Sequence, residues 1–169
     1  MVNSGIIEKF KNVKILVMDV DGTLTDSSMY YSERGEELKR FSTRDGMGLT
    51  IFHKHGFQSA ILTSENSIIA QQRAKKLKVN HVIIDSKDKS NDLINLVESL
   101  DLKLNNVAYI GDDVNDAEAM KLAGISACPA DSVNLIKDIA DYQCKFNGGN
   151  GAVREFIELI LQNNDKPIF

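Results

Sequence analysis

Two carboxylates near the start of the chain, those of Asp19 and Asp21, lie in the sequence Asp-Val-Asp-Gly-Thr, directly after a mostly apolar run. That run, residues 13–18, predicts a buried strand. At the carboxyl end of a strand in an open α/β sheet, such side chains reach the edge where ligands bind. Gly22 and the polar residues after it predict that the strand ends here, so that both carboxylates could face one ligand. One could then act as a nucleophile and the other as a proton donor and acceptor, as the hydrolysis of a phosphate ester requires.

Polar residues also follow three later apolar runs, over residues 59–62, 82–84 and 107–111. These residues lie at or just beyond the ends of the predicted strands: Thr63, Lys89, Asp112, Asp113 and, one short turn later, Asp116. A parallel sheet would bring them to one edge, where a hydroxyl, an ammonium and several carboxylates form a site for phosphate and Mg²⁺. On spacing alone, Lys89 could equally be a solvated helix lysine and Asp116 a helix-capping carboxylate.

Predicted strands and helices alternate after residue 43. Helices are expected over residues 45–55, 66–77, 90–100, 115–122, 132–140 and 151–162, with one more strand over residues 125–128. Repeated βα units of this length predict an α/β fold with a doubly wound parallel sheet. The segment of residues 24–42 breaks the alternation and predicts a β-hairpin with Gly35 in its turn.

The composition predicts one domain over residues 1–169, because 169 residues that are 43% hydrophobic can bury one substantial core. No stretch is apolar enough to cross a bilayer, and the first residues lack the apolar core of a signal peptide, so a cytoplasmic protein without a membrane partner is expected. The net charge of −4 argues against a nucleic-acid partner. Cys128 and Cys144 are far apart and are expected to be buried free thiols.

Four motifs of the chain resemble, in the same order, those of the haloacid dehalogenase phosphatase superfamily: DVDGT, ILTSE, the lysine of DSKDKS, and GDDVND. The resemblance implies a Rossmann-like core and a role for each motif residue. Asp19 is expected to be the nucleophile that forms an aspartyl-phosphate. Asp21 is expected to protonate the leaving alcohol and then to activate water, while Thr63 and Lys89 hold the phosphoryl oxygens.

The same resemblance implies that the enzyme requires Mg²⁺. The expected metal ligands are the carboxylates of Asp19 and Asp112 and the backbone carbonyl of Asp21. Asp113 and Asp116 are expected to support this metal shell from behind. The residue types suit the chemistry, because a carboxylate that attacks an anionic phosphate needs positive charge on the phosphoryl oxygens.

A longer likeness narrows the family. The segments TDSSMYYSERGEELKRFSTRDGMGL, YIGDDVND and GGNGAVREF closely resemble the 3-deoxy-D-manno-octulosonate 8-phosphate (KDO 8-phosphate) phosphatase family and its sialic-acid relatives, over about residues 13–162. The likeness implies a phosphorylated 2-keto-3-deoxy sugar acid as the substrate. Larger superfamily members close the site with a cap domain, whereas here only the hairpin stands in its place. The cap-less relatives form homotetramers, so we expect a neighbouring subunit to close the site.

The identity of the sugar acid depends on the residues after Thr63. KDO 8-phosphate phosphatases usually carry a Gly-Arg pair there, whereas this chain has Ser64 and Glu65. Glu65, with Arg73 in the next helix, looks more like the phosphatases of nine-carbon acids such as KDN 9-phosphate. Arg73 could bind a carboxylate and Glu65 a hydroxyl, and Arg44 could also touch the substrate. For each of the three, a structural alternative remains: a surface position, a helix-terminal charge or an ion pair.

The leading interpretation is therefore a Mg²⁺-dependent phosphatase for a KDN or N-acylneuraminate 9-phosphate, acting in sialic-acid synthesis. The first alternative is KDO 8-phosphate hydrolysis in lipopolysaccharide synthesis. The second is a non-catalytic oligomerisation module like those fused to cytidylyltransferases, but the chain retains every motif residue, which argues against a dead module. A phospho-receiver domain would place its acid pair first and its phospho-accepting aspartate on a later strand, and the chain does not follow that pattern.

Overall fold

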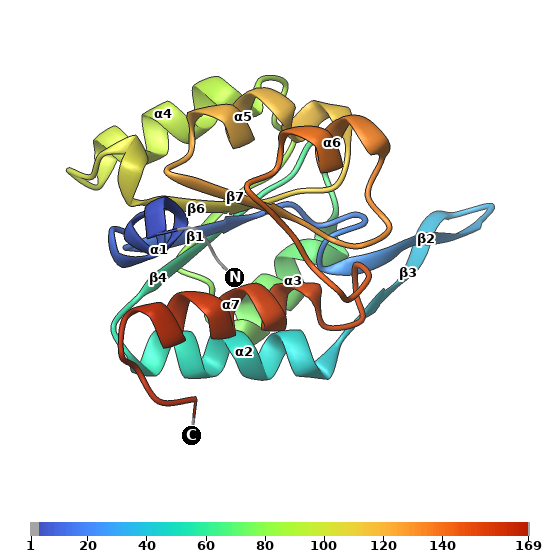
Figure 1. Ribbon diagram of the computed structural model, residues 1–169. Helices are drawn as coiled ribbons and strands as arrows, with labels where there is room; N and C mark the ends of the chain where they lie inside the picture. Colours follow the sequence, from blue (N-terminus) through green and yellow to red (C-terminus); the bar gives the residue numbers. More distant parts are fainter. Residues whose placement is uncertain (1–3, 169) are drawn as a thin grey trace.

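A six-stranded parallel sheet between two layers of helices forms the centre of the computed structural model, which describes residues 4–168 (Figure 1). The strands are β1 (Ile15–Met18), β4 (Gln58–Leu62), β5 (His81–Ile83), β6 (Val107–Ile110), β7 (Ile125–Cys128) and β8 (Tyr142–Gln143). Their order across the sheet is β5-β4-β1-β6-β7-β8, so the order reverses between β1 and β6. This reversal is the switch point at which doubly wound sheets bind ligands. The predicted fold class is confirmed, while the prediction of one domain also covers residues 1–3 and 169, which lie outside the described residues.

The helices form one layer on each face of the sheet, as Figure 1 shows. One layer contains α1 (Ser4–Lys11), α2 (Thr43–Lys54), α3 (Ile68–Leu77) and α7 (Ala152–Asn163); the other contains α4 (Lys89–Ser99), α5 (Ala117–Leu122) and α6 (Asn134–Ile139). Because side chains alternate along a strand, Leu16 and Met18 of β1 pack into the first layer, and Ile15 and Val17 pack into the second. Both faces of β1 are therefore buried, which explains its continuous apolar sequence.

Side-chain caps fix where the helices near the sheet's carboxyl edge begin. The hydroxyl of Ser42 accepts hydrogen bonds from the backbone N–H groups of Arg44 and Asp45 at the start of α2. Ser67 caps α3 and Asp88 caps α4 in the same way. The three helices begin within two residues of the predicted positions.

The expected helix over residues 115–122 is divided. Its first part is a 3₁₀ turn, η2 (Val114–Asp116), followed by α5. The turn is tight because the Asp116 carboxylate accepts hydrogen bonds from the N–H groups of Asp112 and Asp113. A second 3₁₀ turn, η1 (Leu104–Asn106), precedes β6. Helix α1 and the two-residue strand β8 were not predicted. Helix α1 is held by packing of Phe10 on Phe156 of α7.

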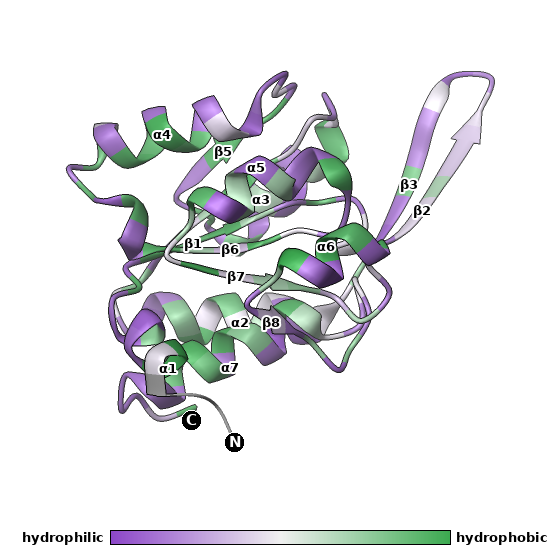
Figure 2. Cartoon of the chain, turned by 45° about the horizontal axis from the view of Figure 1, so that its top comes forward, coloured by the Kyte–Doolittle hydropathy of each residue, from purple (hydrophilic) through white to green (hydrophobic). Residues whose placement is uncertain are grey.

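The hairpin predicted over residues 24–42 is confirmed. It consists of β2 (Thr25–Ser32) and β3 (Gly35–Phe41), which pair antiparallel and project from the body of the molecule (Figure 2). Tyr31 and Leu38 on it are exposed, whereas Lys39 near its base is buried. Cys128 and Cys144 are buried free thiols, as predicted. Within residues 4–168, no helix combines the length and the apolar character needed to cross a membrane.

Candidate active site

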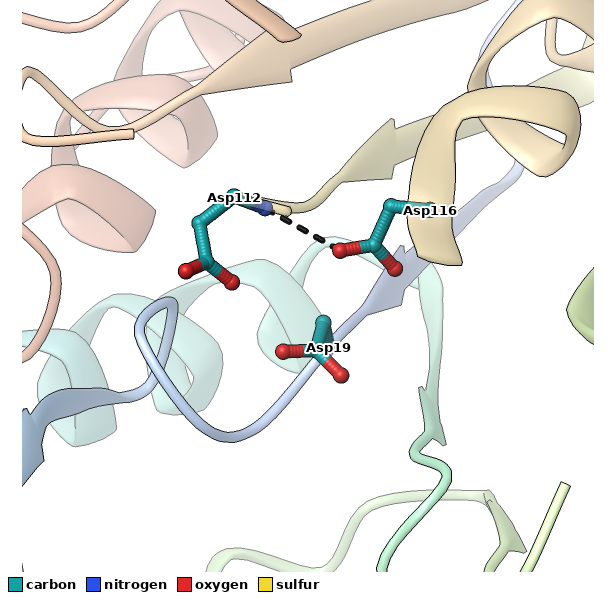
Figure 3. Close-up of side chains that lie close together, drawn as sticks. All are labelled: Asp19, Asp112 and Asp116. Atoms are coloured by element: carbon teal, nitrogen blue, oxygen red, sulfur yellow. Dashed lines mark hydrogen bonds between the residues drawn. The ribbon is translucent and has the colours of Figure 1, made fainter. Parts of the chain in front are cut away.

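The switch point between β1 and β6 brings together the carboxylates on which the sequence prediction rests. Asp19 directly follows β1, and its N–H donates to the carbonyl of Ile110 at 3.0 Å, so β1 and β6 stay paired up to the site. Asp112 lies two residues beyond β6, and Asp116 ends the η2 turn. In Figure 3 the three side chains face a common space. One carboxylate oxygen from each of the three residues can be chosen so that all three lie within 4.8 Å of one another.

The turn after Asp19 is shaped to admit Asp112. The N–H groups of Thr23, Leu24 and Thr25 all donate to the carbonyl of Val20, which folds the chain back sharply. Gly22 has a φ of +96°, a conformation that glycine adopts readily and other residues rarely do. A Cβ atom on Gly22 would lie 2.0 Å from Oδ2 of Asp112. The glycine of the DVDGT motif is therefore needed both for the turn and for the space that the Asp112 carboxylate fills.

Lys89, at the start of α4, is the cation of this cluster. Its Nζ donates to Oδ1 of Asp19 at 2.6 Å and to Oδ1 of Asp116 at 2.7 Å. The residue is only 3% exposed, so it is a buried ion-pair partner and not the solvated helix lysine that spacing alone allowed. Buried charge-assisted hydrogen bonds of this kind fix geometry strongly, because breaking one leaves a charge unpaired.

Asp116 is fully buried and satisfied by the protein itself. Besides Lys89, its Oδ1 accepts from the hydroxyl of Tyr109 at 2.8 Å, and its Oδ2 accepts from the N–H of Asp112 at 3.1 Å (Figure 3). It therefore orients Lys89 and the Asp112 backbone. Asp113 differs, because its side chain is exposed and accepts from the N–H of Val114 at 2.7 Å, which caps the η2 turn.

Burial and like charge raise the pKa values of two carboxyls of the cluster, those of Asp19 and Asp112. Desolvation, and then the charge of Asp116, raise the pKa of Asp19 to about 7, against the opposing effect of Lys89. Desolvation, and then the charges of Asp19 and Asp116, raise the pKa of Asp112 to about 8. Among the described residues, the Lys89 ammonium alone reaches this cluster, and it cannot neutralise three carboxylates. The donor set suits a hard divalent cation such as Mg²⁺, which prefers carboxylate oxygens, with Asp19 and Asp112 as the available side-chain ligands.

Asp21 and Thr63 lie beside Asp19 in one cavity of about 250 Å³. The cavity is lined by Asp19, Asp21, Met29, Thr63, Ser64, Glu65, Asp113, Val114 and Asn115. The hydroxyl oxygen of Thr63 accepts from the N–H of Glu65 at 3.2 Å, and this bond sets the loop after β4. The structure thus brings Asp19, Asp21, Thr63 and Glu65 to one surface, with Lys89 directly behind Asp19.

The two arginines predicted to bind substrate lie elsewhere in this chain. Arg73 donates from Nη2 to the carbonyl of Ser42 at 2.9 Å, and its guanidinium lies 5.4 Å from the centre of the Phe41 ring. It joins α3 to the start of α2 and is not part of the cavity lining. Arg44 is exposed and lines a different hollow with Arg40 and Asn150.

Sequence reasoning missed two side chains of the site, Lys39 and Tyr109. Tyr109 is an apparently ordinary core residue of β6, and nothing in the pattern marks its hydroxyl as a partner of Asp116. Lys39 of β3 is buried and pairs with both Asp21 and Glu36. Burial alone would lower its pKa, but its hydrogen bonds to Asp21 and Glu36 raise the pKa above its usual value, so the ammonium stays charged. The residue types give no warning, because the apolar Leu38 is exposed and the charged Lys39 beside it is buried.

The chain is similar in sequence to known proteins along most of its length. The family pattern described as haloacid dehalogenase-like hydrolase matches residues 53–157. The 3-deoxy-D-manno-octulosonate 8-phosphate phosphatase of Escherichia coli is 36% identical over 160 residues, which cover 95% of this chain and 85% of that protein.

Solved structures of such phosphatases are similar to this chain in fold as well as in sequence. The 3-deoxy-D-manno-octulosonate 8-phosphate phosphatase of Moraxella catarrhalis, in complex with a magnesium ion, a phosphate ion and KDO, has a TM-score of 0.92 and 38% identity, covering 95% of this chain and 92% of that one. The cobalt-bound deoxy-D-mannose-octulosonate 8-phosphate phosphatase of Haemophilus influenzae has a TM-score of 0.90 and 32% identity, covering 93% and 92% of the two chains.

The raised pKa values of Asp19 and Asp112 make metal binding depend on pH. In the metal-free protein these carboxyls hold protons more tightly when folded than when unfolded, so stability falls as the pH rises from about 4 to about 8. Mg²⁺ competes with those protons. The rise in Tm on adding Mg²⁺ is therefore expected to be larger at about pH 8.5 than at about pH 6, measured by thermal unfolding.

A matched pair of variants controls this measurement. Asp112→Asn should remove most of the Mg²⁺-dependent rise in Tm, whereas Asp138→Asn, at an exposed position of α6, should leave it intact. Equal rises at both pH values, retained in Asp112→Asn, would show that the metal binds somewhere else.

Proposed function

The chain belongs to the haloacid dehalogenase-like hydrolases, and from that membership we propose that it hydrolyses the phosphate monoester of a 2-keto-3-deoxy sugar acid. It is a phosphatase, as its relatives along 95% of its length are. The observation that carries the proposal is the cluster of Asp19, Lys89 and Asp112, in which Asp19 and Lys89 are buried, with Asp21 in the same cavity as Asp19. A nucleophilic carboxylate, a second carboxylate for proton transfer and a fixed ammonium are what phosphoryl transfer through a covalent intermediate needs.

In the first step, the Asp19 carboxylate attacks phosphorus, and the bond from phosphorus to the sugar oxygen breaks. Asp21 donates its proton to that oxygen, so the alcohol leaves neutral and Asp21 becomes a carboxylate. Lys89 and the Thr63 hydroxyl hold the phosphoryl oxygens during the transfer. Lys89 already holds Asp19 at 2.6 Å, which fixes the nucleophile before substrate arrives.

In the second step, Asp21 removes a proton from water, and the water oxygen attacks phosphorus. The bond between phosphorus and the Asp19 oxygen breaks, which releases phosphate and restores both carboxyl groups to their starting states. Asp19, Asp112 and the backbone carbonyl of Asp21 would hold Mg²⁺. When bound, the ion supplies positive charge that reduces the repulsion between the carboxylate and the phosphate.

Replacing the nucleophile tests the mechanism. Asp19→Asn keeps the shape of the side chain but removes the attacking oxygen anion, so kcat should fall by about 10⁴-fold or more. Phosphate release measures the loss, and circular dichroism with the Tm shows that the fold is kept. Asp138→Asn serves as the matched control. Turnover near the parent rate in Asp19→Asn would exclude Asp19 as the nucleophile.

Between the sugar acids, the relatives favour KDO 8-phosphate. The E. coli and M. catarrhalis proteins, at 36% and 38% identity, are both described as phosphatases of that compound. One observation favours a nine-carbon 9-phosphate as the second candidate. Glu65 stands where KDO 8-phosphate phosphatases usually carry the arginine of their Gly-Arg pair, and it lines the cavity of Asp19. Arg73 is the other residue on which the nine-carbon interpretation relies. It donates a hydrogen bond to the carbonyl of Ser42 and does not line the cavity in the same chain.

A comparison of kcat/KM for KDO 8-phosphate, KDN 9-phosphate and N-acetylneuraminate 9-phosphate decides between the two candidates. We expect KDO 8-phosphate to be cleaved with the highest kcat/KM. Preference for a nine-carbon acid, lost in Glu65→Gln, would instead assign Glu65 to substrate recognition. Cleavage of none of them would remove sugar acids as the substrate class while leaving the phosphatase chemistry to be tested with other esters.

We further propose that the chain forms a homotetramer in which a neighbouring subunit closes the cavity. The hairpin supports this proposal, because Tyr30, Tyr31 and Leu38 on it are 51%, 65% and 63% exposed and offer an apolar surface. Among the described residues, no cap domain shields the site from water, and only the hairpin lies where such a domain would be.

Charge on the hairpin should disrupt such an assembly. The double variant Tyr31→Glu/Leu38→Glu should shift the mass measured by light scattering toward that of one chain and should lower kcat/KM. Met47→Glu/Leu135→Glu, which places the same two negative charges at exposed positions of α2 and α6, is the control. A parent protein that is monomeric and fully active at assay concentration would contradict the proposal.

A further inference from the structure

A chain of polar contacts runs from Asp21 through the base of the hairpin to helix α3. Lys39 donates from Nζ to Oδ1 of Asp21 and, at 2.8 Å, to Oε1 of Glu36. The other oxygen of Glu36 accepts from the Ser67 hydroxyl at 2.6 Å. Ser67 in turn caps α3 by accepting from the N–H of Ala70. The Asp21 carboxylate is thus connected to a helix by four successive side chains and backbone groups.

Lys39 is built into the protein interior. Its side chain is 0% exposed, whereas those of Asp21 and Glu36 are 21% and 17% exposed. A buried ammonium is tolerated only where it is paired and hydrogen-bonded, and Lys39 has a carboxylate on each side. Lysine has a flexible side chain, so two fixed partners are what hold its Nζ at one point.

The two carboxylate oxygens of Asp21 differ in their hydrogen bonding. Oδ1 is occupied by Lys39, whereas Oδ2 is buried and has no hydrogen-bond partner among residues 4–168. Asp21 lines the same cavity as Asp19, so Oδ2 is the oxygen left over for a proton of the leaving group or of water. A buried carboxylate oxygen without a partner is costly unless a ligand supplies one.

We propose that Lys39 is a positioning residue for Asp21: it engages Oδ1 and thereby presents Oδ2 for proton transfer. The inference rests on the proposed function, because it needs Asp21 to be the proton donor. Glu36 acts one step further away by holding Lys39. The hairpin then has a part in the chemistry of its own subunit, in addition to any contact with a neighbour.

The dependence on the leaving group separates this role from a merely structural one. p-Nitrophenolate leaves readily without a proton, whereas the alkoxide of a sugar phosphate needs one. A loss of proton donation therefore lowers kcat/KM for the sugar acid phosphate that the parent enzyme cleaves best. It leaves kcat/KM for p-nitrophenyl phosphate largely unchanged. Because kcat/KM covers only the steps through release of the leaving group, the later attack by water does not enter the comparison.

Lys39→Met keeps much of the side-chain volume and removes the ammonium. We expect it to lower kcat/KM for the sugar acid phosphate by about tenfold or more beyond any fall for p-nitrophenyl phosphate. Glu36→Gln, which can keep both hydrogen bonds but loses its charge, should give a smaller shift in the same direction. Lys121→Met removes an exposed, ion-paired lysine of α5 and should change neither value.

Asp21→Asn is the reference that separates the two proposals. If Asp21→Asn shows no selective loss on the sugar acid phosphate, Asp21 is not the proton donor and the proposed mechanism fails. Suppose instead that Asp21→Asn shows this selective loss, but Lys39→Met and Glu36→Gln lower kcat/KM equally for both substrates or for neither. Only the inference about Lys39 is then overturned. Should Lys39→Met not fold, as judged by its Tm, Glu36→Gln alone decides the inference. The deciding quantity is again the ratio of kcat/KM for the sugar acid phosphate to kcat/KM for p-nitrophenyl phosphate.

Discussion

Three carboxylates, those of Asp19, Asp112 and Asp116, share a buried space with the ammonium of Lys89. Like charges at this distance repel, and burial removes the water that would otherwise screen them. The pKa values of Asp19 and Asp112 rise to about 7 and about 8 in consequence. The rest of the structure serves to hold these groups together despite that cost. An additional cation finds the opposing charge already in place, and a bound cation in turn offers positive charge to a phosphate group.

The carboxylates of the cluster differ in their hydrogen-bond partners, and this difference decides which of them can bind a ligand. Asp116 receives hydrogen bonds from Lys89, Tyr109 and two backbone N–H groups, so it has little capacity left for a ligand. Asp112 is reached by the weaker contact from the Thr23 hydroxyl at 3.4 Å and keeps its oxygens available. Gly22 leaves the space that the Asp112 carboxylate occupies. The two aspartates differ in how many of their oxygen lone pairs are free, and this difference lies in their surroundings, because the residue type is the same.

The grouping of these residues at the carboxyl edge of the sheet was predictable because strand ends and helix starts carry local signals. The apolar runs before Asp19, Thr63 and Asp112, and the helical pattern after Lys89, place these residues correctly. Contacts between elements far apart in sequence carry no such signal. The burial of Lys39 depends on how the hairpin folds back on Asp21, and the position of Arg73 depends on the carbonyl of Ser42, which any residue would offer. Residues that are placed by such contacts are the hardest to predict for this reason.

The strand order has a consequence for how the protein is made. Thr23 and Asp112, whose side chains meet in the site, are 89 positions apart, because β6 pairs with β1 only after β4 and β5 have been added on the other side. On a ribosome, the first half of the chain emerges with one edge of β1 unpaired and with Asp19 lacking its neighbouring acids. An unpaired apolar edge is open to association with other chains until β6 arrives. Early folding therefore proceeds without the charge repulsion of the finished cluster, which assembles only once most of the chain has been synthesised.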